Sequence, residues 1–190
     1  MRVVILDGFP VDHPAAADLD VLVDELESRG RGVHWLRLTE LKLGLCRGCF
    51  GCWVKTPGEC FIDDDARRVA REYIQSGLAV LATPLSFGGY GSLLKRAVDR
   101  LIPLIMPLFK RVRGEVHHVP RYPAYPELLG LGWLPVADRS QERNFTRLIE
   151  RNAINFWAAN RNAVTLYAEE SPRERRGKLI RVLNQLEVRR

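Results

Sequence analysis

The chain has 190 residues, of which 46% are hydrophobic and 27% are charged, and its formal net charge is +6. This length suits one domain with a full core, so we expect a single domain over residues 1–190. No apolar run approaches the roughly 20 residues that span a bilayer, and the apolar start before Asp7 is too short for a signal-peptide core. We therefore expect a cytoplasmic protein with no membrane partner.

The surplus of positive charge raises the question of a nucleic-acid partner. The Lys and Arg residues are spread along the chain, however, and the densest group, over residues 173–178, lies in an expected terminal helix. A solvated helix face explains such a group better than a nucleic-acid site does, so we expect no nucleic-acid partner. The positive charge also suits small molecules that carry phosphate.

Short apolar runs and helical periods alternate along the chain. The expected elements, in chain order, are a strand over 2–6, a helix ending at Gly30, a strand over 33–38, a cysteine-rich loop over 41–62, a helix entered at Asp63 to Asp65, a strand over 78–83, a helix over 93–104, an irregular insertion over about 108–126, a strand over 128–134, a helix over 141–157, a strand over 163–167 and a basic helix. We see no internal repeat and no linker.

Such alternation predicts right-handed crossovers and a parallel sheet covered on both faces. Five strands in this length predict an α/β, three-layer flavodoxin-like sandwich with strand order 2-1-3-4-5. In such sheets the ligand lies at the carboxyl ends of the strands, beside the first strand. The loops after the first and third strands are therefore expected to form a site, and the cysteine loop opens on the same edge.

All four cysteines of the chain, Cys46, Cys49, Cys52 and Cys60, lie in the expected loop with the spacing C-x2-C-x2-C-x7-C. Three ligands crowded together suit an iron–sulfur cluster, whereas zinc sites more often use two separated pairs. Thiols that pack beneath a cofactor or react with one another are the other readings. The sequence leaves these three possibilities open.

The loop after the third strand is rich in glycine and aromatic residues and contains Thr83, Pro84, Leu85, Ser86, Phe87, Gly88, Gly89 and Tyr90. Glycine lets backbone N–H groups approach a flat ring closely. Phe87 and Tyr90 are candidates to stack on or flank an isoalloxazine ring. The alternative reading is an ordinary strand-to-helix turn with a helix cap near Ser92.

The cysteine motif, the acidic pair Asp63 and Asp64, the loop Thr83 to Tyr90 and the signature residues Lys95, Asp99 and Arg100 together resemble the iron–sulfur flavoprotein branch of the NADPH-dependent FMN reductase family. The close match covers residues 41 to about 104. The resemblance implies a flavodoxin-like fold, FMN as cofactor, and a homodimer or homotetramer. It also implies electron transfer or NAD(P)H-linked reduction with a small-molecule or protein redox partner.

The loop after the first strand departs from that family, which usually has Ser, Thr and Arg residues there to hold the FMN phosphate. Here the expected contacts are Gly8, Phe9, Pro10 and His13, and no Ser, Thr, Arg or Lys is present between residues 7 and 16. Carboxylates at positions 7 and 12 would each repel a phosphate dianion by about 1 kcal/mol or more. Backbone amides and His13, or another loop, would have to hold the phosphate.

The sequence thus predicts an FMN-dependent oxidoreductase or electron-transfer flavoprotein, linked to NAD(P)H, with a 4Fe–4S cluster as one of the open readings of the four cysteines. It singles out no catalytic residue. The alternative is a non-catalytic flavodoxin-like scaffold with a structural metal and no flavin.

Overall fold

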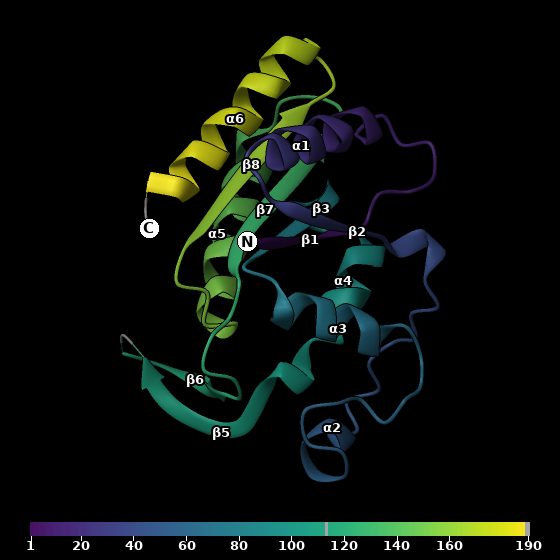
Figure 1. The fold of residues 1–190 in the computed structure, drawn as a ribbon, viewed down its shortest axis with the longest axis vertical. Coiled ribbons are helices and arrows are strands. Elements are labelled where there is room, and N and C mark those ends of the chain that lie inside the picture. The colour runs from purple at the N-terminus through teal and green to yellow at the C-terminus, as the bar shows by residue number, and fades with distance from the viewer. Residues whose placement is uncertain (113, 189–190) are drawn as a thin grey trace.

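A computed structural model describes residues 1–112 and 114–188. Its centre is a parallel sheet in the order β2-β1-β3-β7-β8 (Figure 1). The strands are β1 (Arg2–Asp7), β2 (Gly32–Arg37), β3 (Leu78–Ser86), β7 (Glu127–Leu134) and β8 (Arg161–Tyr167). This order confirms the predicted flavodoxin-like sandwich. A short strand, β4 (Gly89–Tyr90), pairs antiparallel with the end of β3.

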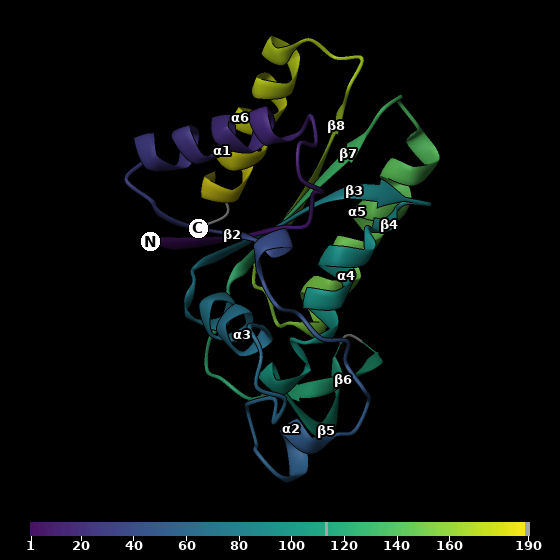
Figure 2. The same cartoon turned by 90° about the vertical axis from the view of Figure 1, so that its right-hand side faces the viewer.

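Helices cover both faces of the sheet (Figure 2). One face carries α1 (Ala16–Ser28) and α6 (Pro172–Val188), and the other carries α3 (Ala66–Gln75), α4 (Ser92–Asp99) and α5 (Arg139–Asn155). Side chains of a strand alternate between faces, so Val3 and Ile5 pack with the first pair while Val4 and Leu6 pack with the other three helices. Two apolar cores therefore share one sheet. None of the described helices is long and apolar enough to cross a membrane.

The two glycines of β7 weaken its sequence signal, yet close packing requires at least one of them. A Cβ atom at Gly130 would lie 2.4 Å from Cγ1 of Ile149 and 2.9 Å from Cζ of Phe145, both in α5. Helix α5 therefore approaches the strand more closely than any side chain at position 130 would allow. Because Gly130 has no side chain, α5 can pack against the centre of the sheet.

The predicted helix over 93–104 is too long. Helix α4 ends at Asp99, and Ile102–Leu104 forms a separate 3₁₀ turn that contains Pro103. Proline cannot donate to the preceding helical turn, which explains the interruption. The break turns the chain away from the sheet and toward the cysteine loop.

The expected irregular insertion over 108–126 is also wrong in part, because a β-hairpin of β5 (Ile105–Val112) and β6 (Glu115–Pro120) occupies most of it. Most of β5 is exposed, so it lacks the alternating pattern by which a half-buried strand is recognised. Residue 113 of this insertion and residues 189–190 lie outside the described residues. The cysteine loop contains a short helix, α2 (Gly51–Val54), which the sequence analysis did not predict.

Candidate functional site

The four cysteines face a common cavity. Its volume is about 390 Å³, and it is lined by Cys46, Cys49, Cys52, Cys60, the end of α4 and the following 3₁₀ turn. Tight turns bring the thiols together, because Gly48 and Phe50 both adopt positive φ angles, of 62° and 55°. A Cβ atom at Gly51 would lie 2.6 Å from the ring of Phe61, so glycine is needed where the loop folds back on itself.

The thiols differ in exposure. Cys46 and Cys49 are exposed, Cys60 is half-buried and Cys52 is buried, and all four are free. Burial raises the pKa of the Cys52 thiol, and the neighbouring Cys60 raises it further. Across residues 1–112 and 114–188, no three cysteine, histidine or acidic side chains are grouped closely enough to hold a single metal ion.

Arg100 forms the cationic wall of this cavity. Its side chain is 2% exposed, and it donates hydrogen bonds of 2.8 Å to each carboxylate oxygen of Asp64 and of 2.8 Å to the carbonyl oxygen of Gly44. It also lies 3.4 Å from Sγ of Cys60, to which it donates. Burial opposes ionisation of Asp64, but its hydrogen bonds to Arg100 and to backbone N–H groups hold its pKa below the usual value. A buried cation is thus fixed against one of the four sulfur atoms.

Trp53 fastens the cysteine loop to the hairpin. Its ring nitrogen donates to the carbonyl oxygens of Ile105, at 2.9 Å, and Ile102, at 3.3 Å. Its ring stacks with Phe50 and contacts His118 of β6, with centroid separations of 5.4 and 5.0 Å. The tryptophan that follows Cys52 therefore packs between the loop and the hairpin.

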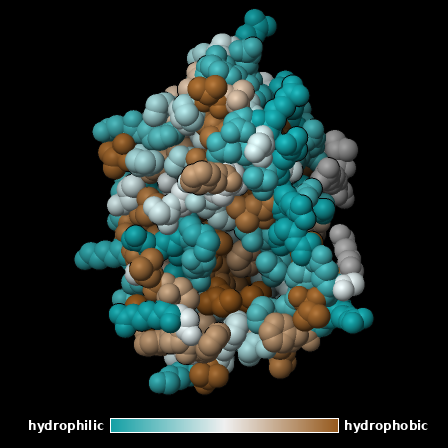
Figure 3. Space-filling view, turned by 180° about the vertical axis from the view of Figure 1, so that it is seen from behind, coloured by the Kyte–Doolittle hydropathy of each residue, from teal (hydrophilic) through white to brown (hydrophobic). Residues whose placement is uncertain are grey.

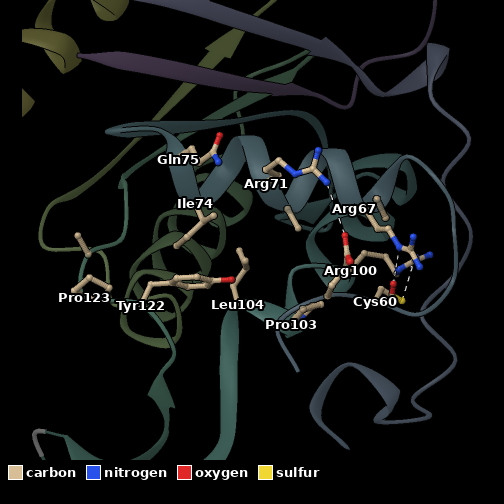
Figure 4. Close-up of a pocket in the computed structure, with 15 residues that line it drawn as sticks. Cys60, Arg67, Arg71, Ile74, Gln75, Arg100, Pro103, Leu104, Tyr122 and Pro123 are labelled. Carbon is tan, nitrogen blue, oxygen red and sulfur yellow. Dashed lines mark hydrogen bonds and ion pairs between the residues drawn. The ribbon is translucent and has the colours of Figure 1, made fainter. Parts of the chain in front are cut away.

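A second cavity, of about 450 Å³, lies on the other side of Cys60 and Arg100 (Figure 4). Helix α3 supplies one wall and the segment Tyr122 to Ala124, after the hairpin, supplies the opposite wall. Cys60, Arg100 and Pro103 line both cavities. The two cavities are therefore neighbours that share a wall.

Two residues of the loop after β3 point inward rather than toward a ligand. Thr83 is fully buried, and its hydroxyl accepts from the N–H of Gly91 and donates to the carbonyl of Pro84. The hydroxyl of Tyr90 accepts from Asn152, its ring packs against Phe145, and burial raises its pKa. Thr83 therefore closes the loop on itself, and Tyr90 holds the loop against α5.

Other residues of the same loop face a third cavity, of about 650 Å³, between the ends of β3 and β7. Its lining includes Leu85, Phe87 and the segment from Leu134 to Arg139. Phe87 is 93% exposed at a φ of 53°, and the N–H of Gly88 donates to the side chain of Gln141. Ser86 is exposed, while Pro84 and Gly89 are half-buried. This part of the predicted site offers an apolar, accessible surface at the carboxyl edge of the sheet.

The loop after β1 is closed by its own hydrogen bonds. The N–H of Phe9 donates to the carboxylate of Asp7, the N–H of Ala15 donates to Nδ1 of His13, and the N–H of Ala16 donates to the carbonyl of His13. Phe9 is buried and stacks on His13, whereas Pro10 is exposed. The N–H groups of Gly8, Phe9, His13, Ala15 and Ala16 are thus already used and are not available to a phosphate.

The electrostatics of this loop oppose a phosphate as well. Asp7 is 7% exposed and accepts a hydrogen bond from the indole N–H of Trp35. Burial also lowers the pKa of His13, which therefore favours its neutral form. In the first turn of α1, the carboxylate of Asp18 is already paired with Arg175 at 2.8 Å. Gly8, Phe9, Pro10 and His13 do not fit the FMN phosphate.

Comparison with known proteins finds relatives that are named iron–sulfur flavoproteins. The chain is 31% identical over 104 residues to a protein named iron–sulfur flavoprotein from Archaeoglobus fulgidus, a match that covers 54% of this chain and 46% of that protein. The resemblance to iron–sulfur flavoproteins is confirmed. The chain spans about half the length of the curated relatives that it matches. No family model matches it.

The fold has close structural counterparts. An NAD(P)H:quinone oxidoreductase from Methanothermobacter marburgensis superposes with a TM-score of 0.68 at 13% identity, covering 97% of this chain and 94% of that one. An FMN-dependent NADH-azoreductase from Bacillus anthracis, solved in complex with FMN, superposes with a TM-score of 0.65 at 12% identity, covering 100% of this chain and 99% of that one. At such low identities, these matches show a shared fold and nothing more specific.

Sequence reasoning brought the four cysteines to one site but missed the contacts that surround them. Asp64 and Arg100 were noted as motif residues, yet their pairing across 36 positions has no periodic signal. Tyr122 was read as part of an irregular excursion. The one feature of the sequence that points to a site at Tyr122 is an aromatic ring in a proline-rich segment.

Proposed function

We propose that the protein is an FMN-dependent oxidoreductase or electron-transfer flavoprotein, linked to NAD(P)H, that holds a 4Fe–4S cluster on Cys46, Cys49, Cys52 and Cys60. The observation that carries the proposal is the common cavity lined by these four thiols. The similarity to iron–sulfur flavoproteins supports it independently. A small-molecule or protein redox partner would complete the electron path.

The chemistry of the cysteine cavity suits a cluster. A cluster bound by four thiolates carries net negative charge, and Arg100 brings a fixed positive charge to the sulfur of Cys60. Zinc bonds sulfur at about 2.3 Å, so it requires four thiolates that nearly touch, whereas a cluster is a larger body. A bound cluster would supply one-electron storage at this site.

The flavin ring is best accommodated at the third cavity, between β3 and β7. Phe87 offers an exposed aromatic face there, and Leu85 lies beside it. A bound flavin supplies hydride acceptance and one-electron release. Because the loop after β1 does not fit the phosphate, we propose that the protein binds the flavin through its ring, with Ser86 and Gly89 as neighbouring contacts.

The test is anaerobic purification followed by metal and sulfide analysis and a visible spectrum. About four iron and four sulfide per chain, together with flavin absorbance after reconstitution with FMN, support the proposal. NADPH and NADH would then be added to see which bleaches the flavin. Absence of flavin absorbance after reconstitution would overturn the flavin-dependent function. A Cys52→Ser variant should lose the iron, while Arg68→Gln, an exposed change on α3, should retain it.

A second candidate is a non-catalytic scaffold with a structural metal and no flavin. The closed loop after β1 favours it, because the hydrogen bonds from Phe9 to Asp7 and from Ala15 to His13 leave no phosphate cradle. One zinc per chain and no flavin binding are its expected results. The same metal analysis and spectrum therefore separate the two functions.

We also propose that the chain forms a homodimer or homotetramer through the surface around α2 and the hairpin. The lower half of the face seen in Figure 3 is hollowed and lined by apolar side chains. Exposed apolar residues of the two elements are Phe50, Val54, Leu108, Phe109 and Val116. Light scattering coupled to size-exclusion chromatography measures the mass directly, and a monomer at all concentrations would contradict the proposal.

A further inference from the structure

The second cavity has the form of a ligand site rather than a packing defect. Its volume of about 450 Å³ lies in the range of small-molecule pockets. Its apolar walls come from elements far apart in the chain: Ala70 and Ile74 of α3, Leu104 of the 3₁₀ turn, and Tyr122. Figure 4 shows the Ile74 side chain and the Tyr122 ring on opposite sides of the space.

The slot between Ile74 and Tyr122 suits a planar ring. An aromatic face opposite an aliphatic side chain buries both faces of a flat molecule, and aromatic pairs prefer stacked or edge contacts. Hydrogen bonds from the residues on either side of Tyr122 hold this segment in place. Arg121 donates to the carbonyl of Pro103 at 2.9 Å, and the hydroxyl of Tyr125 donates to the carbonyl of Leu104. The wall is therefore fixed rather than free to collapse.

One of the three arginines of this cavity has its guanidinium available. Arg67 is occupied by the carbonyls of Cys60 and Phe61, and Arg100 by Asp64. The Arg71 side chain is 61% exposed, and its ion-pair partner Glu59 lies 3.8 Å away, which is too long for a hydrogen bond. A carboxylate ligand would displace this loose ion pair and form a charge-assisted, two-pronged contact.

We propose that this cavity binds a small aromatic carboxylate, with its ring between Ile74 and Tyr122 and its carboxylate on Arg71. The hydroxyl of Tyr122 forms no hydrogen bond with any residue that the structure describes, so it is free to meet a polar substituent of the ring. The site requires neither flavin nor cluster. Because Cys60 lines both cavities, the ligand would lie against the wall of the cysteine cavity.

Calorimetric titration of the protein as isolated with 2-naphthoate tests the proposal, with 2-naphthamide as the neutral isostere. The acid should bind saturably and at least about tenfold more tightly than the amide, since a hydrogen-bonded charge contributes that much. Arg71→Gln should remove this preference. Arg68→Gln, on the same helix but outside the cavity, should leave it unchanged.

Two further variants locate the ligand. Glu59→Gln removes the competing carboxylate and should tighten 2-naphthoate binding about threefold. Tyr122→Leu should weaken both probes, with thermal melting used to verify its fold. No saturable binding of 2-naphthoate, equal affinity for acid and amide, or no loss in Arg71→Gln would each overturn the proposal. None of these results depends on flavin or metal content, so they are independent of the proposed redox function.

Discussion

Arg100 and Asp64 form a buried ion pair in which each of the two nitrogen–oxygen distances is 2.8 Å. Arg100 directly follows α4, and Asp64 lies two residues before the start of α3. The same carboxylate accepts from the N–H groups of Gly44 and Ala66. The pair therefore joins α3, α4 and the start of the cysteine loop at one point.

Replacing Arg100 with methionine should destabilise the protein strongly. The substitution keeps much of the side-chain volume but leaves Asp64, whose side chain is 12% exposed, without its main partner. Breaking a buried pair by removing one member costs about 3–5 kcal/mol. Urea unfolding measures the loss, and Arg68→Met should change the free energy of unfolding by less than about 0.5 kcal/mol. A loss below about 1 kcal/mol for Arg100→Met would contradict the assigned role.

The same pair predicts a pH dependence. Hydrogen bonds hold the pKa of Asp64 below its ordinary value, so its contribution to stability is full above the unfolded pKa of about 3.9 and is lost as the pH falls through the folded pKa. In Asp64→Asn this contribution is absent. The difference in free energy of unfolding between the wild type and Asp64→Asn should therefore stay nearly constant down to the unfolded pKa of about 3.9 and shrink as the pH falls below it. A difference that stays constant below this pKa would show that the ionised carboxylate is not the stabilising form.

FMN and riboflavin should bind with similar affinity, because the loop after β1 has no place for the phosphate. The carboxylate of Asp7 takes the N–H of Phe9, and burial keeps His13 toward its neutral form. Fluorescence titration should give dissociation constants for the two flavins within about threefold, a difference of less than 1 kcal/mol. FMN binding more than tenfold tighter than riboflavin would show that a phosphate site exists elsewhere. Failure of both flavins to bind would instead count against a flavin function.

The sequence predicted the sheet because its strands are short apolar runs separated by helical periods. Nearly every residue of β1 and the first six residues of β3 are buried, which agrees with the continuous apolar character of these runs. The β5–β6 hairpin escaped prediction because exposed residues dominate β5, and its aromatic contacts, such as Phe109 on His118, appear only after folding.

The cysteine site was predictable in composition but not in its surroundings. The close spacing of the four cysteines predicts that their thiols share one site. The cation beside Cys60, in contrast, is Arg100, which lies 40 positions away in the sequence. Tyr90 shows the same limit. Glycines and aromatic residues suggested a ligand contact, yet its hydroxyl bonds Asn152 in α5. The direction of a side chain at the end of a strand depends on where the strand stops, which the sequence pattern does not give.

The cysteines of metal-free protein should differ in reactivity. The thiolate is the nucleophile, and burial raises the pKa of the Cys52 thiol while also shielding it. Alkylation with iodoacetamide followed by peptide mass spectrometry should modify the exposed Cys46 and Cys49 at least about tenfold faster than Cys52. Equal rates for all the cysteines in folded protein would contradict the buried position of Cys52. Equal rates in urea serve as the control for intrinsic reactivity.

Gly130→Ala should destabilise the protein because α5 lies against the strand at that point. The new Cβ atom would lie 2.4 Å from Cγ1 and 2.5 Å from Cδ1 of Ile149, so the helix must shift. Overpacking of this kind costs about 1–3 kcal/mol. Gly32→Ala is the matched control, since a Cβ atom there meets nothing within 4 Å, and alanine in place of glycine in a strand should be neutral or slightly stabilising.

A double-mutant cycle identifies the cause of that loss. In an Ile149→Ala background the two atoms nearest to the new Cβ are gone and only Cζ of Phe145, at 2.9 Å, still clashes, so Gly130→Ala should cost at least about 1 kcal/mol less than in the wild type. The cycle is measured by urea unfolding of the wild type, the two single variants and the double variant. An unchanged cost would mean that the strain arises from Phe145 or from the strand backbone rather than from Ile149. The close approach of α5 to β7 would then have a different contact at its centre.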